Sequence, residues 1–174
     1  MKNKRRAFIT GIKSIKLNKK EKFFLKKYRP WGVILFSRNI RSISQIAKLT
    51  SDIKKIFRDK NYPILIDEEG GTVTRLSQII DNSYFSANYF LKIYKLNPKK
   101  FNVFISIYIK QICFLLRTLG ININTVPVLD VIRNNSSKIL KNRTYGKNPK
   151  IVRNIGAQII SLFHKYKVAT VMKH

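Results

Sequence analysis

Five consecutive residues, Asp67-Glu68-Glu69-Gly70-Gly71, combine side chains and backbone freedom that suit a binding site for a polar ligand. They hold three of the chain's eight acidic residues, and ionised carboxylates accept hydrogen bonds from hydroxyl and amide donors. The two glycines allow the backbone to turn sharply and to approach a ligand closely. Arg75 follows four residues later, where its guanidinium can turn back toward the carboxylates. A solvated turn has the same composition, because turns favour Asp and Gly, so both interpretations stand at this point.

The positions of the acidic residues favour a site over a solvated turn. Four of the eight fit exposed helix surfaces or loops: Glu21, Asp52, Asp59 and Asp81. The other four follow predicted strands: Asp67, Glu68, Glu69 and Asp130. Because α/β sheets and barrels place ligand sites at the carboxyl ends of their strands, this distribution predicts a site at that edge.

The elements that position these acids alternate along the chain. Five short apolar segments are predicted as strands, at 7–11, 32–36, 63–68, 122–129 and 168–172. Amphipathic helices are predicted after the capping residues Asn18, Ser42, Asn97 and Asn148, with a shorter helix over 87–94. This alternation predicts an α/β protein with one domain and a parallel sheet. A complete (β/α)₈ barrel needs roughly 250 residues and eight strands, whereas these 174 residues supply five strands.

The net charge of +28 is extreme for a chain of this length. Nucleic acid and anionic membrane surfaces are the usual partners of such proteins. However, the lysines are spread over every segment, and the chain is also rich in Ile and Asn, which AT-biased coding produces without selection for a partner. We therefore interpret the charge mainly as background, with a non-enzymatic polyanion-binding protein as the rival hypothesis.

The remaining composition argues against several classes of protein. Cys113 is the single cysteine, so no intramolecular disulfide is possible, and its apolar surroundings predict a buried side chain. Two distant histidines give no metal-ligand spacing, and no phosphate-binding glycine motif is present, so no metal or cofactor is expected. The apolar segments 7–12 and 103–116 are too short for a signal peptide core and a membrane span, respectively. We expect a cytoplasmic protein without a membrane partner.

Five motifs occur in order along the chain: GVILFSRN at 32–39, DEEGGTVTR at 67–75, PVLD at 127–130, RTYG at 143–146 and KH at 173–174. Together they resemble the N-terminal part of glycoside hydrolase family 3, in particular the single-domain bacterial β-N-acetylglucosaminidases that recycle peptidoglycan fragments. The resemblance covers almost the whole chain. It implies that residues 1–174 form an incomplete TIM (β/α)₈ barrel with about five of the eight βα units.

The resemblance also implies a substrate and the residues that bind it. The family enzymes remove terminal N-acetylglucosamine from β-linked glycans with retention of configuration, which implies a muropeptide-type glycan as the partner, and no specific nucleic acid. The implied sugar-binding residues are Asp67, Arg75, Arg143, Lys173 and His174. A carboxylate can accept hydrogen bonds from sugar hydroxyls, and Arg or Lys can donate to hydroxyl oxygens. Asp130 is expected to support the site rather than touch sugar.

The family pattern continues beyond the last residue of this chain. After Lys-His it reads Phe-Pro-Gly-His-Gly, then a loop with an Asp-x-His acid/base pair, and later an Asp nucleophile. Retaining hydrolysis needs the nucleophile and the acid/base about 5–5.5 Å apart in the usual carboxylate case. We therefore expect an N-terminal fragment or truncated copy that has no catalytic residues and is inactive alone. A β-glucosidase-type hydrolase of the same family remains an alternative, because the parts that contact the N-acetyl group lie largely beyond His174.

Two further sets of residues have an expected structural role. Glu68 and Glu69 point to opposite faces if the chain is extended, so one of them is expected to bond the turn backbone or to brace an arginine. Tyr89, Phe90 and Tyr94 are expected in the core, with a platform for sugar stacking as the alternative.

Overall fold

The strands of this protein form one parallel sheet. A computed structural model describes residues 4–137, 140 and 142–174. Five strands pair in chain order: β1 (Arg6–Gly11), β2 (Pro30–Leu35), β3 (Ile64–Ile66), β4 (Ile123–Asn124) and β5 (Ala169–Thr170). The helices with described bounds are α1 (Lys19–Tyr28), the short 3₁₀ helix η1 (Ser37–Asn39), α2 (Ile43–Phe57), α3 (Ala87–Leu96), α4 (Pro98–Thr118) and α6 (Pro149–Lys165). The predicted α/β class and the five parallel strands are confirmed.

The helices begin at the capping residues that the sequence indicated. At α1, the Asn18 side chain accepts a hydrogen bond from the N–H of Glu21 at 2.8 Å, and the Glu21 carboxylate accepts one from the N–H of Asn18 at 2.9 Å. This reciprocal pair satisfies two donors that no helical carbonyl reaches. Asn97 and Asn148 cap α4 and α6, and each stands just before a proline at the first helical position.

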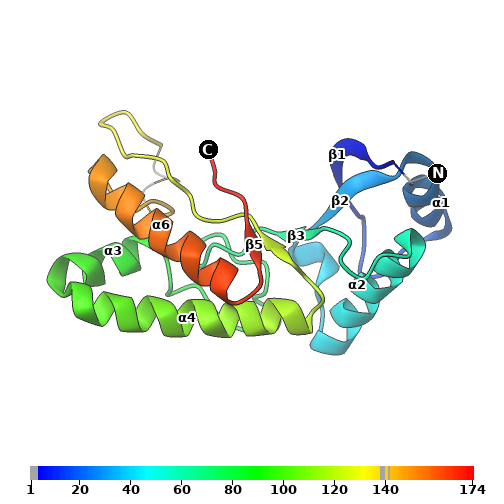
Figure 1. The fold of residues 1–174 in the computed structure, drawn as a ribbon, viewed down its shortest axis with the longest axis horizontal. Helices are drawn as coiled ribbons and strands as arrows, with labels where there is room; N and C mark the ends of the chain where they lie inside the picture. Colours follow the sequence, from blue (N-terminus) through cyan, green and yellow to red (C-terminus); the bar gives the residue numbers. More distant parts are fainter. Residues whose placement is uncertain (1–3, 138–139, 141) are drawn as a thin grey trace.

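The helices are divided between the two ends of the sheet (Figure 1). α1 and α2 lie beside β1 and β2, near the start of the chain. α3, α4 and α6 lie together at the other end, where α4 contacts both α3 and α6. Because β1 and β5 are the outer strands, the sheet formed by the described residues is open rather than closed into a barrel.

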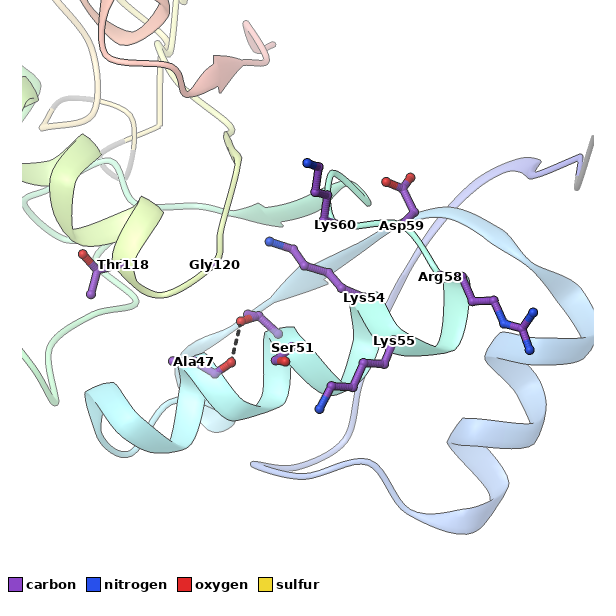
Figure 2. Close-up of a pocket in the computed structure, with 10 residues that line it drawn as sticks. Ala47, Ser51, Lys54, Lys55, Arg58, Asp59, Lys60, Thr118 and Gly120 are labelled. Carbon is purple, nitrogen blue, oxygen red and sulfur yellow. Dashed lines mark hydrogen bonds between the residues drawn. The ribbon is translucent and has the colours of Figure 1, made fainter.

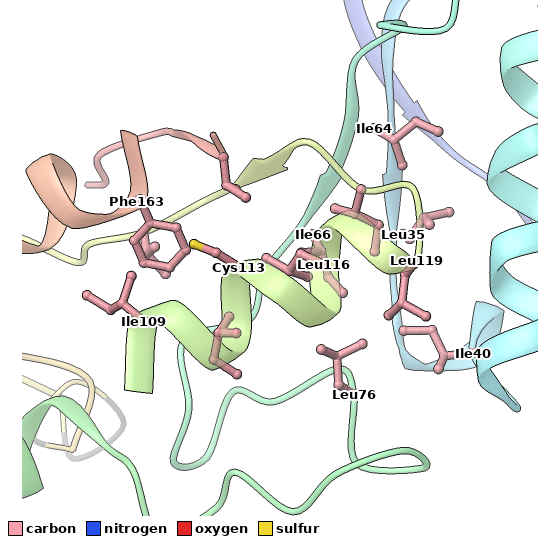
Figure 3. Close-up of a cluster of buried hydrophobic side chains, with 14 of the residues drawn as sticks. Leu35, Ile40, Ile64, Ile66, Leu76, Ile109, Cys113, Leu116, Leu119 and Phe163 are labelled. Carbon is pink, nitrogen blue, oxygen red and sulfur yellow. The ribbon is translucent and has the colours of Figure 1, made fainter. Parts of the chain in front are cut away.

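The core between the helices and the sheet is mainly aliphatic, with Phe163 among its side chains (Figure 3). Leu35 of β2, Ile66 of β3 and Leu116 of α4 are all completely buried in it. Cys113 is also completely buried in this cluster. Burial raises the pKa of its thiol to about 12, so Cys113 stays protonated at neutral pH and packs as a small apolar side chain, as predicted.

The helix α4 is longer than the apolar segment that the sequence indicated. It runs for 21 residues, and by length and composition alone it could cross a membrane. That corrects the expectation of a segment too short to span. Length and composition alone do not distinguish a membrane span from the core helix of a soluble protein. In this fold, one face of α4 packs into the core through Phe101, Ile105 and Ile109.

The last three strands are shorter than the apolar segments that predicted them, whereas β1 and β2 are each six residues long. The fourth was expected over 122–129, but β4 covers Ile123–Asn124, and pairing resumes at an isolated bridge between Val128 and Lys173. Pro127 lies between and has no N–H to donate to a ladder. Of the three aromatic residues expected in the core, Phe90 is buried and forms an edge-to-face pair with Phe101. Tyr89 and Tyr94 are half-buried and pack against the core.

Candidate functional site

The turn after β3 brings the end of the DEEGGTVTR segment back over its beginning. Gly70 and Gly71 have φ values of +79° and +65°, in the left-handed region that favours glycine. The N–H of Glu69 donates to the carbonyl of Val73 at 3.0 Å. As a result Arg75 faces Asp67, with 3.6 Å between its Nη2 and the Oδ2 of Asp67, and the expectation that Arg75 turns back is confirmed.

Glu68 anchors this turn from inside and is only 2% exposed. Its carboxylate accepts hydrogen bonds from the N–H groups of Arg75 at 2.7 Å and Leu76 at 3.0 Å. The Thr74 hydroxyl donates to it at 2.7 Å and the Asn82 amide at 3.1 Å. Four donors account for the acceptor sites of an ionised carboxylate, so Glu68 is a structural residue, and the expected bonds to the turn backbone are confirmed.

Two polar residues that sequence reasoning missed lie at the end of β4 (Asn124) and directly after it (Thr125). The buried Asn124 donates from Nδ2 to the carbonyl of Glu68 at 2.8 Å and accepts at Oδ1 from the N–H of Glu68 at 3.0 Å. Its side chain therefore replaces a strand partner where β3 ends. Thr125 donates its hydroxyl to the carboxylate of Asp67. The signal that could have found both residues is the group of polar side chains, Asn122, Asn124 and Thr125, in an otherwise apolar predicted strand.

Asp67 lies at the end of β3 among three donors. Its Oδ1 accepts from Thr125 and from the Lys173 ammonium at 3.0 Å, and Arg75 lies near its Oδ2. Burial opposes ionisation, but the hydrogen bonds of Thr125 and Lys173 and the charges of Lys173 and Arg75 outweigh it, so the pKa of Asp67 is lowered. Within the described residues Oδ2 accepts no hydrogen bond, so it is available to a ligand donor.

Glu69 connects Arg143 to the same group of charges. The Arg143 guanidinium donates from Nε and Nη2 to the two Glu69 oxygens, each at 2.8 Å, and the Lys173 ammonium lies 2.7 Å from Oε1. This parallel two-point pairing orients the guanidinium plane. The side chain of Glu69 is 6% exposed and that of Arg143 is 16% exposed, so Glu69 braces the arginine, as expected for one of the two glutamates.

Four of the five residues expected to bind sugar lie together, and the fifth lies apart. Asp67, Arg75 and Lys173 form one cluster, and Arg143 joins it through Glu69. His174 lies apart, with its Nδ1 2.9 Å from Oδ2 of Asp130 and its side chain 54% exposed. Their contact with sugar stays a prediction.

The cluster can orient hydroxyl groups, and it has the features of a binding site more than of an acid/base pair. It combines a partly free carboxylate with guanidinium and ammonium donors, all held by other residues. A general acid at neutral pH needs a raised pKa, whereas that of Asp67 is lowered. In the part of the chain that the structure describes, no group of three or more His, Cys, Asp or Glu side chains could hold a metal ion.

Known proteins with a similar sequence or fold point to one family. The chain is 29% identical to beta-hexosaminidase A of Pseudoalteromonas piscicida over 154 residues, which is 86% of this chain and 25% of that protein. It is 23% identical to a beta-hexosaminidase of Xanthomonas campestris pv. campestris (strain B100), covering 95% of this chain and 49% of the relative. The chain thus spans between a quarter and about half of the length of these curated relatives.

A solved structure gives the same result for the fold. The crystal structure of NagZ from Neisseria gonorrhoeae in complex with N-trifluoroacetyl-D-glucosamine matches with a TM-score of 0.87 at 24% identity, over 98% of this chain and 50% of that one. The model of the glycosyl hydrolase family 3 N-terminal domain matches residues 6–174. The chain therefore belongs to glycosyl hydrolase family 3, and its five parallel strands correspond to part of that family's barrel domain.

Proposed function

We propose that this chain is the sugar-binding part of a retaining β-N-acetylhexosaminidase that acts on terminal N-acetylglucosamine of peptidoglycan fragments. The observation that carries the proposal is Asp67, whose Oδ1 is held by Thr125 and Lys173 while its Oδ2 accepts no hydrogen bond from the described residues. A fixed, ionised acceptor with a free oxygen suits the hydroxyl donors of a sugar ring. The ligand named for the similar NagZ structure, N-trifluoroacetyl-D-glucosamine, supports this class of sugar.

The cations around Asp67 supply the complementary donors. Arg75 and Lys173 approach the carboxylate from two sides. Arg75 keeps N–H groups that can donate to hydroxyl oxygens, whereas the three N–H groups of Lys173 face Asp67, Thr125 and Glu69. Arg143 is oriented by Glu69 and extends the donor surface. We include His174 as a sugar contact because its half-exposed ring lies at the same end of the sheet, beside Asp130.

We further propose that the 174 residues alone do not hydrolyse the glycosidic bond. The three carboxylates after β3 are engaged by other groups of the chain. Glu68 accepts four hydrogen bonds, Glu69 is paired with Arg143 and Lys173, and the pKa of Asp67 is lowered. Binding and orientation of a sugar are therefore the chemistry that this chain supports.

Sugar binding is tested with the Asp67→Asn substitution. Loss of a charge-assisted hydrogen bond costs about 1.5–3 kcal/mol, so the affinity for N-acetylglucosamine should fall about 10–100-fold. Titration by NMR chemical shifts measures the weak affinity of a monosaccharide. Asp81→Asn is the matched control, because Asp81 lies in an exposed loop, and it should leave affinity unchanged. Equal affinities for the wild type and Asp67→Asn would refute the assignment, and equal affinity for glucose would favour the β-glucosidase alternative.

Turnover is tested with a chromogenic N-acetyl-β-glucosaminide. The purified chain should release no chromophore above the rate of buffer, because the three carboxylates after β3 are engaged by hydrogen bonds and cations of the chain itself. The assay includes a complete hexosaminidase as the positive control. Release at an enzyme-like rate that Asp67→Asn abolishes would overturn the proposal of a binding role without hydrolysis.

A further inference from the structure

The outward face of α4 carries large apolar side chains although it does not contact the core, and Lys110 lies among them. Four large apolar side chains are exposed on this helix: Val103 (58%), Phe104 (49%), Ile107 (57%) and Phe114 (70%). Val103, Ile107 and Phe114 are separated by four and seven residues, so they lie on one face of the helix. The opposite face packs into the core through Ile105, Ile109 and Cys113. We call the four exposed residues the α4 stripe.

Packing on the sheet does not require such a stripe, because the other two long helices lack it. The exposed residues of α2 include Ser44, Lys48, Ser51 and Lys55. Those of α6 include Arg153, Asn154, Ser161 and Lys165. These are the polar outer faces expected of helices that cover a sheet. The α4 stripe therefore indicates a surface that another body covers, since large exposed apolar patches mark interaction sites.

The charges around the stripe have one sign. No acidic residue occurs between Asp81 and Asp130, a segment that includes all of α3 and α4. The exposed cations on these helices are Lys92, Lys95, Lys99, Lys100, Lys110 and Arg117. Apolar side chains bordered by lysines are typical of helices that lie in the interface of an anionic membrane, where the long side chains reach the headgroups.

We propose, in contrast to the expectation from sequence of no membrane partner, that the α4 stripe docks this protein on the surface of an anionic phospholipid bilayer. The helix lies in the plane of the interface and does not span the membrane, because its other face is part of the core. Charge complementarity selects this partner over a second copy of the chain. Two copies meeting through α4 would bring together two chains of charge +28, with lysines facing lysines, whereas anionic headgroups attract them. The proposal is independent of the proposed sugar site.

α1 provides a matched comparison on the other side of the molecule. It exposes two neighbouring rings, Phe23 at 63% and Phe24 at 37%, and its exposed lysines include Lys19, Lys20 and Lys26. Charge and exposed rings are therefore present on α1 without a stripe that extends along the helix. If net charge alone bound the protein to membranes, α1 and α4 would be equivalent.

The test is co-sedimentation of the whole 174-residue chain with vesicles. Wild type should bind vesicles of phosphatidylcholine with phosphatidylglycerol and not vesicles of phosphatidylcholine alone. Removing each phenylalanine from the interface should lower the partition coefficient by about tenfold, so Phe104→Ser/Phe114→Ser should bind far more weakly. Phe23→Ser should bind like wild type. Circular dichroism checks that each variant is folded, and Phe104→Leu/Phe114→Leu, which keeps the apolar surface, should retain binding.

Two further measurements test the role of the lysines and the oligomeric state of the protein. Lys99→Gln/Lys100→Gln/Lys110→Gln should weaken binding more than Lys19→Gln/Lys20→Gln/Lys26→Gln, which removes the same charge from α1. Equal losses in the two triple variants, or equal losses in Phe23→Ser and the α4 double variant, would overturn the proposal in favour of general adsorption. Absence of binding to anionic vesicles would also overturn it. So would sedimentation showing a dimer that Phe104→Ser/Phe114→Ser dissociates, because the stripe would then bind a second copy.

Discussion

Charged side chains gather at the carboxyl ends and at the amino ends of the parallel strands, and the two groups are organised differently. At the carboxyl end, Asp67 and Glu69 are each joined to cations by hydrogen bonds or ion pairs. At the amino end, a hollow between α2 and the segment before β4 is lined by Lys54, Lys55 and Lys60, whose side chains point in different directions (Figure 2). Among the described residues no ion pair holds these three lysines.

The difference shows that the density of charge does not identify the site. At the amino end, the one acid, Asp59, is engaged by Arg5 and by the N–H of Asn61. Burial lowers the pKa of Lys54, and the charge of Asp59 offsets this in part. Lys54 also lies in the last turn of α2, where a cation suits the helix dipole. At the carboxyl end, ion pairs between Asp67, Glu69 and their cations hold the side chains in fixed positions. These fixed positions are what a ligand site requires.

The strongest test of this contrast removes the buried anchor at the carboxyl end. Glu68→Ala leaves four donors without their acceptor, and we expect the free energy of unfolding to fall by about 3–5 kcal/mol. Urea denaturation followed by circular dichroism measures it. The control is Asp52→Ala, which removes an exposed i,i+4 ion pair with Lys48 and should cost less than about 0.5 kcal/mol. Similar losses in both variants would show that Glu68 does not anchor the turn.

A matched pair of lysine substitutions compares the two ends directly. Lys173→Met leaves Asp67 and Glu69 with one cation fewer, and we expect a loss of about 1–3 kcal/mol. Lys54→Met removes a charge that burial already disfavours, so its effect should lie within about 0.5 kcal/mol. Thermal and urea denaturation of the two variants measure the difference. If Lys54→Met proved the more damaging substitution, the contrast between the ends would be reversed.

The smallest expected effect is a pH dependence of the stability that Asp67, at the carboxyl end, contributes. The pKa of Asp67 is lower in the folded chain than its ordinary value of 3.8, so the unfolded chain binds this proton more readily. The stabilisation is therefore complete above the unfolded pKa and is lost as the pH falls through the folded one. The stability difference between wild type and Asp67→Asn should be constant above about pH 5 and shrink below about pH 4. A difference that did not change with pH would contradict the lowered pKa.

The sequence predicts those parts of the site that depend on local pattern. The acids after β3 and the capping residues Asn18 and Asn97 are recognisable because each acts within a few positions of itself. Asn124 and Thr125 were missed because their roles depend on partners more than fifty residues away. Strand pairing creates those contacts, and no local pattern encodes them.

The same limit applies to the bounds of elements and to the outer surface. Periodicity located all five strands, but it could not show that the fourth stops after Asn124, because this depends on how Pro127 interrupts the ladder. It also treated the apolar residues of α4 as one group. Only the packed fold separates Ile109, which is buried, from Ile107, which is exposed.

The single thiol of the chain, Cys113, can be used to measure how often the core around α4 opens. Because it is fully enclosed and remains protonated at neutral pH, a thiol-specific reagent can reach it and react when α4 separates from its neighbours. The labelling rate of the unmodified chain thus counts such openings over time, without any introduced probe. Adding a sugar or vesicles to that assay would show which of them keeps this half of the molecule closed.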